Sequence, residues 1–171
     1  AVGLFFAVIA LRNGMAGTEG DHLGMIAILF LFAVVWASDV FAYFVGRALG
    51  GPKLAPRISP NKTWSGFCGG LSGGMLAGTG LLAAFGYGRL FFYHAALSLV
   101  LSLASIAGDL FESAFKRRFG VKDSGRLIPG HGGFMDRLDG FIFAAILAAI
   151  IGVSVGGVAQ ASRGLLLFSR L

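Results

Sequence analysis

Residues 23–46 read LGMIAILFLFAVVWASDVFAYFVG. The only carboxylate in this run is Asp39, and the run holds no Lys or Arg. An α-helix needs about 20 mostly apolar residues to cross the hydrocarbon core of a bilayer. Leu23–Gly46 is long enough, and we predict that it forms a membrane-spanning helix.

Three further apolar runs of spanning length follow, at 66–88, 90–110 and 140–159, whereas Ala1–Leu11 is too short to cross. The chain is 56% hydrophobic and only 13% charged, against roughly 25% charged residues in soluble domains. We therefore predict an all-α polytopic transmembrane bundle with a polar segment between its apolar runs. It forms one membrane domain in three parts, 1–65, 66–110 and 111–171, and we expect further helices N-terminal to it.

Two polar segments, 47–65 and 112–139, hold ten of the fourteen Lys and Arg residues. They fall on the same side if each apolar run crosses once, and the positive-inside rule places that side in the cytoplasm. Cations beside apolar spans indicate anionic headgroups rather than nucleic acid. Three prolines, at 52, 56 and 60, argue against a continuous helix in the first segment. The basic tail falls on the opposite side unless it lies flat on the membrane surface.

Glycines recur every fourth residue in the second run, at positions 66, 70, 74 and 78. They line one face of a helix and let a neighbouring helix approach closely. We expect His94, inside the third run, to serve the membrane interface. Cys68 is the only cysteine, which excludes a disulfide framework within the chain.

The polar segment Ser113–Asp139 reads SAFKRRFGVKDSGRLIPGHGGFMDRLD. Its cations suit phosphate groups, and its carboxylates suit a hard cation such as Mg²⁺. If the preceding helix continues past the membrane surface, one polar stripe forms at i, i+3, i+4 and i+7, made of Asp109, Glu112, Ser113 and Lys116.

Asp39 is a carboxylate inside an apolar span and should face a polar cavity. Tyr43 and Arg47 follow it at i+4 and i+8, so the three share a helical face. The alternative is a structural ion pair between Asp39 and Arg47 near the membrane interface.

Ser113–Asp139 resembles the signature of the phosphatidate cytidylyltransferases, the CDP-diacylglycerol synthases. The matching residues are Ser113, Lys116, Arg117, Lys122, Asp123, Pro129, His131, Gly132, Gly133, Asp136, Arg137 and Asp139. A second stretch, Ser59–Thr63, resembles the Ser-Pro-x-Lys-Thr sequence of the same family. This chain departs from the family there, because Asn61 stands where a second Lys is common and Ser65 where Glu is common.

The resemblance implies transfer of a cytidylyl group from CTP to phosphatidate, with Mg²⁺ as cofactor and a second cation left open. The implied catalytic residues are Asp109, Asp136, Lys122 and His131, with Asp109 and Asp136 as metal ligands. The implied substrate-binding residues are Ser113, Lys116, Arg117, Asp123, Arg137, Asp139, Lys62, Asn61 and Asp39. The family also implies a homodimer in the inner membrane, with its site facing the cytoplasm.

Structural roles stay open for the same residues. Asp136 and Asp139 precede an apolar run, where carboxylates favour the helix dipole. The cations could form a solvated face, and Lys62 could bind anionic lipid. His131 could be a base, a phosphate donor or a loop stabiliser. Three other functions fit less well: a CTP-dependent lipid kinase, a transporter with a path along Asp39 and Asp109, and a non-catalytic remnant.

Overall fold

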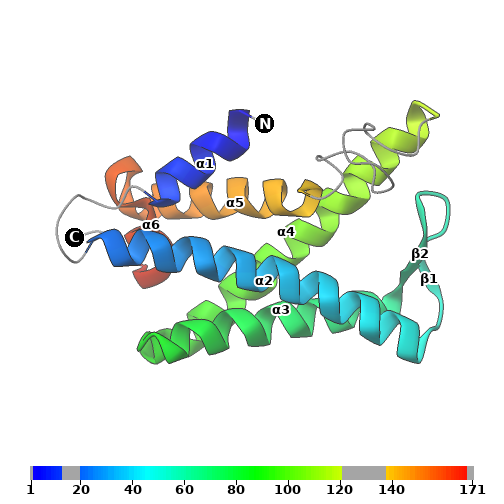
Figure 1. Ribbon diagram of the computed structural model, residues 1–171, viewed down its shortest axis with the longest axis horizontal. Helices are drawn as coiled ribbons and strands as arrows, with labels where there is room; N and C mark the ends of the chain where they lie inside the picture. Colours follow the sequence, from blue (N-terminus) through cyan, green and yellow to red (C-terminus); the bar gives the residue numbers. More distant parts are fainter. Residues whose placement is uncertain (1, 13–19, 121–137, 169–171) are drawn as a thin grey trace, which may run out of the picture.

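The computed structural model describes residues 2–12, 20–120 and 138–168, which form a helical bundle with one small hairpin (Figure 1). The helices are α1 (Val2–Arg12), α2 (Gly20–Leu49), α3 (Trp64–Ala84), α4 (Phe91–Arg118), α5 (Asp139–Gly156) and α6 (Ala161–Leu167). Four helices in the described ranges are long and apolar enough to cross a membrane, at His22–Leu49, Trp64–Ala84, Gly88–Arg118 and Asp139–Gly156. The predicted fold class, a polytopic helical bundle, is confirmed.

Several helix ends differ from the predicted spans. Helix α2 runs three residues further at each end, and α3 ends at Ala84 instead of Gly88. Helix α4 ends at Arg118 instead of Leu110, so it carries the polar stripe as part of one continuous helix. Helix α5 ends at Gly156 instead of Ala159, because Gly157 adopts φ 75° and ψ 171°, a conformation that only glycine adopts readily.

A β-hairpin joins α2 to α3, where the sequence predicted only a loop that is not helical. Its strands are β1 (Lys53–Ala55) and β2 (Ser59–Thr63), which pair antiparallel with Lys53 opposite Thr63 and Ala55 opposite Ser59. Gly50 and Gly51 precede it with positive φ, which ends α2 and turns the chain. Figure 1 places this hairpin at the same end of the bundle as the end of α4 and the start of α5.

Thr63 closes the hairpin and also caps α3. Its Oγ1 accepts a hydrogen bond from the Gly66 N–H at 3.1 Å, while its backbone is extended, as an N-cap residue requires. The Trp64 N–H donates to the Pro52 carbonyl oxygen at 3.1 Å. The backbone on both sides of the last strand residue is therefore held in place.

We expect Thr63→Val to lower the free energy of unfolding by about 1 kcal/mol, since the isosteric change leaves a buried helix N–H without its acceptor. Thr79→Val is the matched control, because Thr79 lies on the same helix, is equally buried, and bonds the Met75 carbonyl oxygen, which the helix already satisfies. Thermal unfolding in detergent measures both variants. Equal losses in the two would contradict a capping role for Thr63.

The predicted glycine face of α3 packs against α2 and α4 within the chain. A Cβ on Gly66 would lie 2.8 Å from the Ala42 carbonyl oxygen, and one on Gly74 would overlap the Ser102 hydroxyl. Close helix approach through these glycines is confirmed. Because the face is already covered by the chain's own helices, it is not free to form a contact between two copies.

The tail folds back on the bundle as α6, at the end opposite the hairpin (Figure 1). It packs on α5, where a Cβ on Gly164 would overlap the backbone of Gly152. Tyr93 Oη donates to the Leu165 carbonyl oxygen at 2.8 Å, and His94 Nε2 donates to that of Leu166 at 2.8 Å. His94 is 1% exposed, so the prediction that it serves the membrane interface is wrong.

Candidate active site

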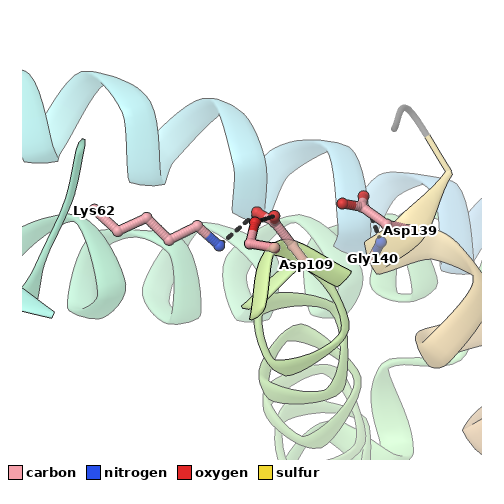
Figure 2. A network of polar contacts seen from close by, with 5 residues as sticks. Lys62, Asp109, Asp139 and Gly140 are labelled. Carbon is pink, nitrogen blue, oxygen red and sulfur yellow. Dashed lines mark hydrogen bonds and ion pairs between the residues drawn. The ribbon is translucent and has the colours of Figure 1, made fainter. Parts of the chain in front are cut away.

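An ion pair between β2 and α4 forms the centre of the candidate site. Lys62 Nζ contacts Asp109 Oδ2, as Figure 2 shows, and Ser113 Oγ lies 3.4 Å from Asp109 Oδ1. The two charged side chains are 25% and 36% exposed. Both oxygens of Asp109 therefore have a polar neighbour, while the pair remains accessible from outside.

The polar stripe of α4 continues from Asp109 toward the end of the helix. Lys116 Nζ lies 3.5 Å from Glu112 Oε1, one turn beyond the Asp109–Ser113 contact. The prediction that the helix carries these four residues on one face is confirmed. Arg117 Nε donates to the Ile58 carbonyl oxygen at 3.4 Å. This hydrogen bond joins the hairpin to the last turns of α4.

The start of α5 brings a second carboxylate to the site. Asp139 Oδ1 accepts the Gly140 N–H at 2.7 Å, which satisfies one of the free donors at a helix N-terminus. A Cβ on Gly140 would lie 2.5 Å from Ser105 Oγ and 2.9 Å from the Ser105 carbonyl oxygen. The first turn of α5 is thus pressed against α4, close to Asp109 (Figure 2).

Asp39 on α2 completes the charged group. Its carboxylate interacts electrostatically with those of Asp109 and Asp139 and with the Lys62 ammonium. Arg47 instead donates to Tyr43 Oη at 3.0 Å. Between the described side chains of α2, the alternative ion pair of Asp39 with Arg47 is therefore not formed.

The site brings three carboxylates, Asp39, Asp109 and Asp139, within electrostatic reach of one another. Like charges at this range repel, and a bound cation relieves the repulsion. Carboxylate oxygens are the donors that Mg²⁺ prefers, so the residues fit that ion chemically. In the described ranges no three His, Cys, Asp or Glu side chains are grouped closely enough to hold a metal by themselves. One or two carboxylates, with substrate phosphates, is the usual arrangement for Mg²⁺.

Five of the predicted site residues lie outside the described ranges: Asp136, Lys122, His131, Asp123 and Arg137. Convergence of Asp109 and Asp136 on one metal ion stays a prediction. Asn61 is exposed on β2, next to Lys62. The sequence predicted Glu112 on the polar stripe but not as a site residue. Its i+3 spacing from Asp109 could have identified it as one.

Together the fold and the site define a multi-pass membrane protein with a cluster of opposite charges at one end of its helices. Comparison with known sequences then shows that the chain belongs to the cytidylyltransferase family, whose sequence model matches residues 1–155.

Curated relatives share this region. The chain is 52% identical over 157 residues to a phosphatidate cytidylyltransferase of Brucella abortus biovar 1 (strain 9-941), covering 89% of this chain and 56% of that protein. It is 44% identical over 138 residues to one of Staphylococcus saprophyticus, covering 81% and 52%. For one of Staphylococcus aureus (strain COL) the identity is 45% over 134 residues, covering 78% and 50%. The chain spans about half the length of these relatives.

Proposed function

We propose that this chain carries out cytidylyl transfer from CTP to phosphatidate, giving CDP-diacylglycerol and pyrophosphate. The observation that carries the proposal is the cluster of Lys62, Asp109 and Asp139, gathered from three separate elements at one end of the membrane helices. Its composition suits a reaction between two polyanions, and the relatives' name supports the choice of substrates.

In the proposed reaction an oxygen of the phosphatidate phosphate attacks the α-phosphorus of CTP. A new P–O bond forms, the bond from the α-phosphorus to the bridging oxygen breaks, and pyrophosphate leaves with the electron pair. The attacking phosphate monoester is already anionic near neutral pH, so it needs little help from a base. Catalysis then depends mainly on positioning the two anions and stabilising their charge.

The cationic and the acidic residues of the site have different roles in this reaction. Lys62, Lys116 and Arg117 neutralise phosphate oxygens, together with Lys122 and Arg137 from the signature segment. Asp109 and Asp136 would hold Mg²⁺, which supplies charge neutralisation to the CTP phosphates when bound. Asp39 and Asp139 strengthen the negative field in which the metal binds. His131 donates to or positions a phosphate.

The position of the site suits an amphiphilic substrate. The acyl chains of phosphatidate remain in the bilayer beside the helices, while its phosphate reaches the charged end. The Lys and Arg content of the two polar segments supports a cytoplasmic site in the inner membrane. A homodimer, which the family resemblance implies, would form through a surface other than the glycine face of α3.

Product analysis tests the proposal. Purified protein is incubated with phosphatidate and labelled CTP, with Mg²⁺ or with a chelator. Release of pyrophosphate together with labelled CDP-diacylglycerol supports the transfer, and the chelator should abolish it. Release of CDP with a lipid phosphate would identify a lipid kinase instead. No turnover of either kind would contradict both enzymes.

A further inference from the structure

The ion pair of Lys62 occupies an oxygen of Asp109 that the proposed metal site would need. We propose that Lys62 exchanges partners during the reaction: it neutralises Asp109 in the substrate-free protein and moves to the CTP phosphates once a metal ion binds there. This inference rests on the proposed function, because the exchange requires a metal ion and a polyphosphate.

The backbone beside Lys62 is held by hydrogen bonds, whereas its side chain is partly exposed. Thr63, the next residue, pairs with Lys53 across the hairpin and caps α3. A lysine ammonium sits on a flexible four-carbon stem and binds as a point charge in several directions. At 25% exposed, the side chain has access to an incoming ligand. Lys62 can therefore change partners without any movement of the hairpin.

The charges around Asp109 favour such an exchange. Asp39 from α2 and Asp139 from α5 both repel the Asp109 carboxylate, and among the described side chains Lys62 is the cation that forms an ion pair with it. Lys116, on the same helix as Asp109, forms an ion pair with Glu112. A divalent cation supplies more positive charge than the ammonium that it displaces, so the carboxylates are never left without a counterion.

The displaced ammonium then has a specific destination. A metal ion on Asp109 would repel Lys62, and the phosphates of CTP that binds next would attract it. Ser113 can keep its contact with the second oxygen of Asp109 throughout, at the observed 3.4 Å. The same lysine would thus neutralise Asp109 before the metal binds and later bind the nucleotide.

Amine labelling tests the exchange without any measurement of turnover. The protein is pulsed with an acetylating reagent, and the modification rates of Lys62 and Lys53 are read by mass spectrometry. Lys62 should react slowly in the protein alone. With Mg²⁺ its rate should rise about threefold, which corresponds to the free energy of an ordinary exposed ion pair. With Mg²⁺ and CTP together the rate should fall again. Lys53, exposed on the paired strand, is the internal control and should not change. Asp109→Asn should make Lys62 react fast without Mg²⁺.

Two results would overturn the exchange: a Lys62 rate that Mg²⁺ does not change, or one that CTP fails to lower again. Pyrophosphate release in the same preparation separates this outcome from failure of the proposed function. Turnover with unchanged labelling rejects the exchange and leaves cytidylyl transfer standing. The full labelling pattern without turnover on phosphatidate supports the exchange and rejects the transfer.

Discussion

Asp109→Asn should slow cytidylyl transfer by about a hundred- to a thousandfold, the usual effect of removing one group that stabilises transition-state charge. Asparagine keeps the size of the side chain and one acceptor oxygen, but it loses the negative charge that attracts a metal ion. It also leaves Lys62 without its ion-pair partner. Pyrophosphate release at saturating CTP and phosphatidate, measured over a range of Mg²⁺ concentrations, gives the effect.

Two comparisons make this result specific. Thermal unfolding of the variant should match that of the parent chain, because the partly exposed pair contributes little to stability. Ser113→Ala should have a much smaller effect on the rate, since its hydroxyl is only a long contact of Asp109. An Asp109→Asn variant with the parent rate at high Mg²⁺ would remove Asp109 from the metal site.

Gly74→Ala should lower the free energy of unfolding by about 2 kcal/mol. This is the net loss, once the higher helix propensity of alanine, up to about 1 kcal/mol, has been subtracted. The new Cβ would overlap the Ser102 hydroxyl and lie 3.0 Å from the Val34 carbonyl oxygen. One neighbour is backbone of α2 and the other is a fully buried side chain of α4, so α3 must move away from both helices. Thermal unfolding in detergent measures the loss.

Gly80→Ala is the matched control on the same helix. A Cβ at this position meets no atom within 4 Å, so the variant should keep the propensity gain and equal or exceed the parent in stability. Adding Ser102→Ala to Gly74→Ala removes the overlapping hydroxyl and should restore part of the loss. Equal behaviour of the two alanine variants would show that the glycine face does not set the helix spacing.

The membrane helices could be predicted from the sequence because length and hydropathy alone define them. The four spans, the glycine face and the polar stripe of α4 all follow from residue spacing. Counting membrane crossings also predicted that residues 47–65 and the last turns of α4 lie at the same end of the bundle. The hydrogen bond from Arg117 to Ile58 joins these two segments.

The hairpin and the contacts around Asp109 could not be predicted in the same way. Prolines in residues 52–60 indicate only that a helix is absent. The pairing of Lys53 with Thr63 depends on two consecutive glycines of positive φ and on a helix cap acting together. The partner of Lys62 lies 47 positions along the chain, as the numbers of Lys62 and Asp109 show. Such a contact depends on how α3 and α4 cross, which no local pattern specifies.

The bonds that Tyr93 and His94 make to the carbonyl oxygens of Leu165 and Leu166 constrain how the protein is assembled during translation. Each bond joins positions 72 residues apart. When α4 leaves the ribosome, the backbone that accepts these bonds has not yet been synthesised. The insertion machinery therefore receives α4 before the acceptors of Tyr93 and His94 exist, and the final packing of this helix waits for the synthesis of α6.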